Sequence, residues 1–395
     1  MNWISQTLAI TGVTLRSIPQ RLGSSIVAII GIGGVVIVFT AVLSIAEGFR
    51  LAMRGTGDPQ TVIVMRSGSD TEMTSTFSGE EARLITEAPG IERGADGVHA
   101  SPELFVIIAV PLARSGTDAN VPLRGLSPKA LTVRPTVKIT EGRMFQPGTS
   151  EIVVGRAATK QFSGVSIGST VYSGKNPWRV VGIFDADGSV AESELWCDAA
   201  VLQGAYNRGN SYQSVYLRLE TMDGLQKLKD ALTTDPRLNV TVVREPEYYE
   251  QQSQVLQMVI RTVGIAIAVL MGLGAIFGAV NTMYSAVAAR TREIATLRAL
   301  GFGATPVVLS VLGEALLLSL IGGLLGGLLA WAAFDGYQTA TMNWQSFSQV
   351  AFAFKVTPNL LGQGLLYASI MGLLGGLFPA VRAARLPIVT ALRQL

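Results

Sequence analysis

The sequence has one cysteine, Cys197, and one histidine, His99, among its 395 residues. A single cysteine excludes an intrachain disulfide, so any domain outside a membrane must be held together by its own core. A lone histidine without cysteine neighbours lacks the converging partners that a catalytic or metal site needs. We therefore interpret His99 as a surface or structural residue and predict neither catalytic residues nor a metal site.

Charge is also scarce, because only 15% of the residues are charged while 49% are hydrophobic. Soluble domains carry about 25% charged residues, so the composition favours a membrane protein. The sequence contains no GxxxxGK[ST] phosphate loop. Its nearest approach, Gly174-Lys175, has Ser169 where the first glycine belongs. These 395 residues are therefore not expected to hydrolyse ATP.

Two acidic stretches are candidate sites for a bound cation. Residues 185–189 (DADGS) place glycine at position 4, whereas a calcium loop of the EF-hand type needs it at position 6, so we predict a turn that follows a strand. We interpret the acidic trio Glu192, Glu194 and Asp198 as a solvated face and assign it no ligand.

Four long apolar runs are each close to the ~20 residues that span a bilayer. They divide the chain as follows: 1–23 interfacial amphipathic helix, 24–46 first span, 47–256 extramembrane domain with helical stalks, 257–288 second span, 289–305 cytoplasmic helix and turn, 306–334 third span, 335–359 short periplasmic loop, 360–381 fourth span, 382–395 cytoplasmic tail. The first run exceeds the 7–15 apolar residues of a cleaved signal peptide, which disfavours that alternative.

Short β-rich runs alternate with helical patterns in the domain between the first and second spans. Such alternation of short strands and helices is typical of an α+β domain, in which the helices pack on one sheet. The predicted strands cover 61–65, 103–111, 121–125, 151–155, 170–172, 178–184, 213–219 and 238–244, and a helix over 78–88 begins with an N-cap serine. The expected fold class is a membrane protein with four transmembrane α-helices and a large α+β periplasmic domain between the first and second.

Arginines set the expected orientation. Arginine and lysine concentrate in the short loops that stay in the cytosol, and this pattern places both termini inside and the large domain in the periplasm. The arginines that mark the inner side are Arg16, Arg21, Arg290, Arg292, Arg298, Arg382, Arg385 and Arg393.

Residues 285–309 form a short basic segment between the second and third spans. Ile294, Leu297 and Leu300 recur at steps of three, which predicts an amphipathic helix. Arg290 and Glu293 are spaced to pair at i,i+3, and Gly301 is placed to end the helix. Either the arginines only anchor the topology, or the helix docks a soluble partner. We favour docking, because the helix is capped and amphipathic.

Glycines in the spans repeat at small-xxx-small spacing, which lets membrane helices approach closely. This spacing predicts a packed bundle or a dimer. The pairs are Gly274 with Gly278, Gly322 with Gly326, Gly323 with Gly327, and Gly372 with Gly376.

Residues 290–301 (RTREIATLRALG) resemble the signature that follows the second span in the MacB/FtsX-like permease family of ABC transporters. Residues 379–392 (PAVRAARLPIVTAL) resemble that family's closing motif, with Pro387 one residue early. The large domain resembles the family's periplasmic core domain at 123–131, 141–145, 151–155 and 180–189. The resemblance covers nearly the whole chain.

The resemblance implies a bacterial inner-membrane permease that pairs with a second copy and with cytosolic ABC ATPase subunits. The residues that match the ATPase-coupling motif are Arg290, Arg292, Glu293, Ile294, Leu297, Arg298 and Gly301. It implies no cofactor on this chain, with ATP and Mg on the partner ATPase. The permease would transmit ATPase motion to the periplasmic domain.

The expected partners are lipid, a periplasmic adaptor and an outer-membrane channel, and no nucleic acid is expected. Three alternatives stay open. They are a permease that extracts lipoproteins, a transmitter that signals to a periplasmic hydrolase without transport, and a membrane receptor or enzyme outside the family.

Overall fold

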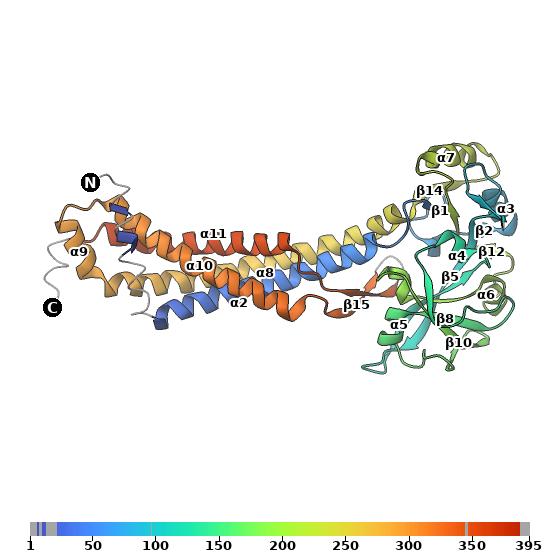
Figure 1. The fold of residues 1–395 in the computed structure, drawn as a ribbon, viewed down its shortest axis with the longest axis horizontal. Coiled ribbons are helices and arrows are strands. Elements are labelled where there is room, and N and C mark those ends of the chain that lie inside the picture. The colour runs from blue at the N-terminus through green and yellow to red at the C-terminus, as the bar shows by residue number, and fades with distance from the viewer. Residues whose placement is uncertain (1–5, 8–9, 13–21, 96, 344–346, 388–395) are drawn as a thin grey trace. The chain divides into compact units, whose positions relative to one another are not determined.

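The structure is a computed structural model that describes all residues except 1–5, 8–9, 13–21, 96, 344–346 and 388–395. Most of the expected interfacial helix, and the tail beyond residue 387, lie outside the described residues. The chain forms two compact units (Figure 1). We call Met1–Glu47, Met258–Tyr337 and Phe354–Leu395 the helical unit, and Gly48–Gln257 and Gln338–Ala353 the sheet unit.

Four helices are long and apolar enough to cross a membrane, which confirms the predicted four-span fold class. They are α2 (Leu22–Arg54), α8 (Glu245–Ala289), α10 (Ala304–Phe334) and α11 (Pro358–Ala384). A short helix, α9 (Thr291–Ala299), follows α8. Both α2 and α8 extend beyond the apolar runs seen in the sequence, so each contains residues of both units without a break.

The sheet unit is built on one ten-stranded sheet with the order β14-β1-β13-β5-β6-β11-β8-β10-β7, in which β9 pairs with β10. The pairs β6–β11 and β8–β10 are parallel and the remaining pairs are antiparallel. The strands are β1 (Thr61–Arg66), β5 (Ala100–Pro111), β6 (Asp118–Leu126), β7 (Lys138–Gly142), β8 (Glu151–Gly155), β9 (Thr170–Ser173), β10 (Asn176–Asp185), β11 (Leu195–Asp198), β13 (Ser214–Arg218) and β14 (Val240–Arg244).

Short elements cover this sheet or connect its strands (Figure 1). The strand pairs β2–β12 and β3–β4 lie outside the main sheet. The helices are α3 (Gly79–Thr86), α4 (Ala130–Val133), α5 (Arg156–Gln161), α6 (Ala199–Ala205) and α7 (Leu225–Thr234), the 3-10 turns are Glu72–Thr74, Val190–Ser193 and Met222–Gly224, and the minor strands are β2 (Phe77–Ser78), β3 (Arg93–Gly94), β4 (Gly97–Val98) and β12 (Ser211–Tyr212).

Two hydrophobic cores lie along the sheet. In one, α3 and α7 pack on β1, β13 and β14 through residues such as Ile85, Leu228 and Val64. In the other, α5 and α6 pack on β5, β6, β8 and β10, with Leu202 and Trp178 fully buried. The predicted N-cap of α3 is confirmed, because Ser78 and Glu81 form a capping box.

The segment expected as a short loop over 335–359 contains a β-hairpin, β15 (Gln338–Asn343) paired with β16 (Ser348–Ala353). The hairpin belongs to the sheet unit, where the Ala351 N–H donates to Ser193 Oγ at 2.9 Å and Phe352 meets Phe49 edge-on at 5.5 Å. Alternate residues of β16 are buried, which is the period of a half-buried strand. The hairpin was not predicted, because this alternation is weak and lies between two long apolar runs.

Candidate functional site

The helix α9 lies between α8 and α10 in the chain, where the sequence predicts a coupling helix. Gly301 has φ of 95°, and the N–H groups of Gly301 and Phe302 donate to the carbonyls of Arg298 and Leu297, each at 3.1 Å. These two bonds are those of a Schellman motif, which needs a residue with positive φ after the helix. The prediction that Gly301 ends the helix is confirmed.

Arg290, immediately before α9, forms two ion pairs. Its Nε lies 3.0 Å from Glu293 Oε2, which confirms the predicted i,i+3 pair. Its Nη1 lies 3.5 Å from Glu314 Oε2 on α10. The side chains of Arg290 and Glu314 are 7% and 4% exposed, whereas Glu293 is 54% exposed. Arg290 therefore connects the start of α9 to a buried carboxylate on the next helix.

The apolar stripe of α9 divides between two environments. Ile294 is buried, and Leu297 packs with it against residues of α8 and α10, including Met283 and Val307. Leu300 is 73% exposed. Ile294 and Leu297 therefore fix α9 within the helical unit, which leaves Leu300 as the large apolar residue that a partner can contact.

Arg298 also holds α9 in place. Its Nη1 donates to the carbonyls of Ala384 at 2.5 Å and Leu386 at 3.2 Å, at the end of α11. The last carbonyls of a helix lack partners within that helix and carry partial negative charge. Arg298 therefore fastens α9 to α11.

The predicted coupling residues thus form two groups. Arg290, Ile294, Leu297 and Arg298 contact the helical unit itself. The exposed members are Arg292, Glu293 and Gly301, beside which lie Thr296 and Leu300. This exposed face offers both signs of charge and one large apolar side chain, a combination that suits a protein surface.

The predicted packing glycines also differ in their surroundings. A Cβ at Gly322 would lie 2.8 Å from the Ile29 carbonyl oxygen of α2, and one at Gly326 would meet Gly33 of the same helix. A Cβ at Gly372 would meet Ser319, and one at Gly376 would lie 2.6 Å from the Cβ of Ala315. Gly274 and Gly278 of α8 face open space. A Cβ at Gly323 would lie 2.7 Å from the Cβ of Ala368, and one at Gly327 would lie 3.2 Å from Leu361, both on α11. Six of the eight predicted glycines therefore allow helices of this chain to approach closely.

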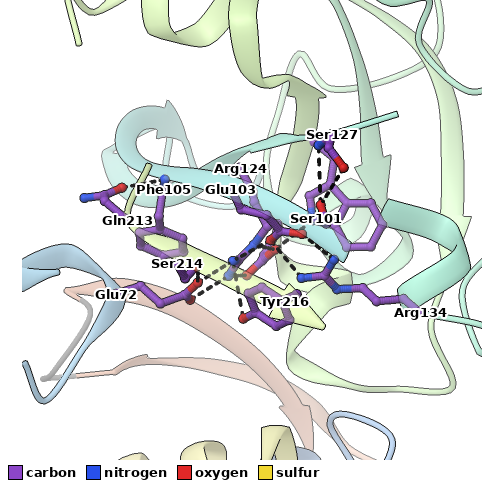
Figure 2. Close-up of polar contacts among 12 residues, drawn as sticks. Glu72, Ser101, Glu103, Phe105, Arg124, Ser127, Arg134, Gln213, Ser214 and Tyr216 are labelled. Atoms are coloured by element: carbon purple, nitrogen blue, oxygen red, sulfur yellow. Dashed lines mark hydrogen bonds and ion pairs between the residues drawn. The ribbon is translucent and has the colours of Figure 1, made fainter. Parts of the chain in front are cut away.

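The sheet unit contains a buried cluster of charged side chains that was not predicted from the sequence (Figure 2). Arg124 on β6 lies at its centre, and its guanidinium donates to Glu72 at 2.7 Å, to Glu103 at 3.1 Å and to Glu194 at 2.8 Å. Arg134 donates to both oxygens of Glu103, at 2.6 and 2.8 Å. We call these five residues the Arg124 network.

Within the Arg124 network, Arg124 and Glu72 each shift the other's pKa toward the charged form. Burial alone would raise the pKa of Glu72, but the charge and hydrogen bonds of Arg124 outweigh burial, so that pKa is lowered. Burial would likewise lower the pKa of Arg124, yet Glu194 and Glu72 raise it well above the usual value. Glu72 and Arg124 therefore favour their charged forms, and the network holds together β5, β6 and the turn Glu72–Thr74.

The first turns of α8 lie beside the Arg124 network. The Glu72 N–H donates to the Tyr248 hydroxyl oxygen at 3.2 Å. Glu245, the first residue of α8, is buried and accepts from the Asp58 N–H at 3.3 Å. Burial raises the pKa of Glu245 to about 7, although Arg134 acts to lower it. The helix that continues toward residue 289 thus begins in a polar, enclosed environment.

The interpretation of Glu192, Glu194 and Asp198 as a solvated face is wrong, because all three side chains are buried. Glu194 belongs to the Arg124 network, Glu192 accepts from the N–H groups of Ala186 and Gly188, and Asp198 caps α6. The partner of Glu194 is distant in sequence, whereas Glu192 and Asp198 accept from N–H groups within six residues of themselves, a local pattern that does not by itself indicate burial. The turn predicted over 185–189 is confirmed, with Asp187 and Gly188 at positive φ. Within the described residues, no His, Cys, Asp or Glu cluster could hold a metal ion.

Together, the four candidate spans, the sheet unit inserted after the first span and the short helix after the second define a multi-span membrane protein with a large extramembrane domain. Residues 25–235 match the model of the MacB-like periplasmic core domain, which is more than half of the chain, and residues 265–388 match that of the FtsX-like permease C-terminal region. The chain belongs to the MacB/FtsX-like family of ABC transporter permeases.

Curated relatives are distant in sequence. The macrolide export ATP-binding/permease protein MacB of Rhodopseudomonas palustris is 25% identical over 340 residues, which are 81% of this chain and 50% of that protein. The ABC transporter permease YknZ of Bacillus subtilis is 23% identical over 339 residues, 79% of this chain and 80% of that protein. The chain thus spans about half the length of the MacB protein and most of the length of YknZ.

Two solved structures are similar to part of this chain. The extracellular domain of YknZ covers 47% of this chain and 100% of that structure, with 18% identity and a TM-score of 0.33. The periplasmic region of MacB from Actinobacillus actinomycetemcomitans covers 53% of this chain and 95% of that structure, with 15% identity and a TM-score of 0.36.

Proposed function

We propose that this permease transmits the motion of a cytosolic ABC ATPase to its sheet unit, and that α9 is the element that receives the motion. The observation that carries the proposal is the division of α9. One side is fixed to α8, α10 and α11 by Arg290, Ile294 and Arg298, and the other side is exposed. When such a helix is displaced by a partner on its exposed face, the displacement is transmitted to every span to which it is bound.

The ATPase is supplied from outside these 395 residues, which contain no phosphate loop. ATP and Mg bind there, and the permease holds no cofactor. The relatives named MacB are described as ATP-binding/permease proteins, which supports a requirement for an ATPase in this family.

The lengths of α2 and α8 support transmission. With 45 residues, α8 is about 68 Å long at 1.5 Å per residue, roughly twice the ~30 Å hydrocarbon core. It is one unbroken helix whose first turns contact the Arg124 network through Tyr248. A displacement at its far end therefore acts on the residues that hold the sheet unit together.

The arginine bias supports a bacterial inner-membrane location with both termini in the cytosol and the sheet unit in the periplasm. The open face of α8 at Gly274 and Gly278 is the surface on which a second copy would pack. An adaptor and an outer-membrane channel would complete an export system.

The test is co-purification of the full chain with the cytosolic ATPase of its native membrane, with ATP hydrolysis as the readout. Leu300→Asp should weaken ATPase binding about tenfold, since a central apolar contact commonly contributes more than 1 kcal/mol. Met222→Asp, which changes an exposed apolar residue of the sheet unit, is the matched control and should bind normally. Equal binding by both variants would show that α9 is not the docking helix.

A further inference from the structure

Glu314 is an acidic residue within an apolar membrane helix. It lies in the third turn of α10, a helix long and apolar enough to cross a membrane, and its side chain is 4% exposed. Burying an ionised carboxylate is costly unless it is paired, and ionisable residues inside spans are retained mainly where they have a function.

The partner of Glu314 also binds the exposed face of the coupling helix. Arg290 pairs with Glu314 through Nη1 and with Glu293 through Nε. Guanidinium is a planar fork with five donors, so one arginine can hold two carboxylates in fixed directions. We call Arg290, Glu293 and Glu314 the Arg290 triad. It joins the end of α8, the first turn of α9 and α10.

The two carboxylates of the Arg290 triad differ in their access to water. Glu293 is 54% exposed, and Glu314 is enclosed. Val287, Ile294, Val311 and Ala315 are all buried in the hydrophobic cluster of this region. Water and salt screen a buried ion pair less than an exposed one, so the attraction between Arg290 and Glu314 is screened less than that between Arg290 and Glu293. A partner that binds α9 can therefore contact Glu293, whereas Glu314 is held within the span α10.

We propose that Glu314 is a positioning residue for ATPase coupling: through Arg290 it fixes α9 to α10, so that displacement of α9 moves α10 with it. This inference rests on the proposed function, because it assigns the route by which motion of the docked helix enters the membrane. Loss of the carboxylate should leave the exposed face of α9 intact and loosen the attachment of α9 to α10, which Ile294 and Leu297 still contact.

The first test needs no ATPase. Spin labels at Thr296→Cys and Leu309→Cys, both exposed positions, are introduced with Cys197→Ala in the full chain in lipid nanodiscs. The parent chain should give one narrow distance distribution between α9 and α10, and Glu314→Gln should broaden it. Asp335→Asn, an acid-to-amide change at the other end of α10 where the acid pairs with Lys355, should leave it narrow. An unchanged distribution in Glu314→Gln would overturn the proposal.

The second test measures coupling in the purified ATPase complex. Glu314→Gln should bind the ATPase with unchanged affinity and reduce its stimulation by the permease about tenfold, within the usual 5–150-fold range of coupling between sites. Glu314→Asp, which keeps the charge, should recover most of the stimulation. Normal stimulation in Glu314→Gln would contradict the proposal.

Two further outcomes separate the hypotheses. If Glu314→Gln fails to fold, the double change Arg290→Gln with Glu314→Gln leaves no unpaired buried charge and should fold. That variant must still be uncoupled, and normal coupling would overturn the proposal. If the parent chain binds no ATPase, the proposed function fails, and the spin-label distances still show whether Glu314 fixes α9.

Discussion

The sheet unit and the helical unit both bury arginine–glutamate pairs, but the two sets are built differently. In the sheet unit, Arg124 contacts three carboxylates, and every member of the Arg124 network is buried. In the helical unit, the Arg290 triad has one enclosed and one exposed carboxylate. A closed network resists change from outside, whereas an open one can be reached by a partner.

This difference assigns separate roles to the two sets. Breaking a fully buried network leaves charges without solvent or partners, which destabilises the fold itself. Weakening the Arg290 triad, in which Glu293 is exposed to water, changes the position of one helix and lowers the free energy of unfolding less. We therefore expect mutations in the Arg124 network to affect folding and mutations in the Arg290 triad to affect coupling.

The largest effect should follow Arg124→Met. It leaves Glu72 and Glu194 buried near Glu103 without their central cation, so the sheet unit should lose about 3–5 kcal/mol of stability. Hydrogen exchange of the full chain, read peptide by peptide, should show lost protection in β5 and β6. Arg143→Met is the control, since Arg143 is about half exposed and pairs with Glu151 at the surface, and it should cost less than about 1 kcal/mol. Similar protection in both variants would refute a fastening role.

Much of this fold is predictable from sequence, because the relevant signals are local. Continuous apolar runs indicated the four spans, the glycine after an amphipathic stretch indicated the end of α9, and an N-cap serine indicated α3. The charged sets were not predictable. Arg124 and Glu194 are 70 residues apart, and Arg290, immediately before α9, is 24 residues from Glu314 on α10. Only the packing of distant segments creates these pairs.

The next effect is a pH dependence of the sheet unit from Glu245. Its pKa is about 7 in the folded chain against 4.5 as the ordinary value. Between pH 4.5 and 7 the folded chain keeps this proton and the unfolded chain releases it, so this carboxyl lowers stability as pH rises, by up to roughly 3 kcal/mol. Glu72, whose pKa is lowered, loses its contribution only as pH falls below 4.5.

Glu245→Gln should abolish this pH dependence, because an amide does not titrate. Hydrogen exchange of peptides around residues 240–257, with rates corrected for intrinsic pH effects, measures it at pH 5 and pH 8. A parent chain that is equally protected at both pH values would contradict the buried, protonated state of Glu245.

Gly326→Ile should weaken packing between α2 and α10, because its Cβ would meet Gly33. Overpacking of this kind costs about 1–3 kcal/mol, which thermal unfolding in detergent can detect. Gly274→Ile places the same side chain in open space on α8 and should leave the unfolding of a single copy unchanged. Equal stability of the two variants would argue against this helix contact.

The smallest effect should come from Gly301→Ala. At φ of 95° an alanine is strained by about 1 kcal/mol, and the end of α9 should fray. Gly301→Asn is the control, because asparagine tolerates positive φ better. ATPase affinity should fall severalfold for alanine and less for asparagine, and the reverse order would contradict the Schellman geometry.

The central claim is that motion received at α9 reaches the sheet unit. Hydrogen exchange of the purified permease–ATPase complex, with and without ATP and Mg, tests it at residues 245–257 of α8. The protection of these residues should change with ATP in the parent chain and stay constant in Glu314→Gln. No ATP-dependent change in a parent complex that hydrolyses ATP would contradict transmission through this chain.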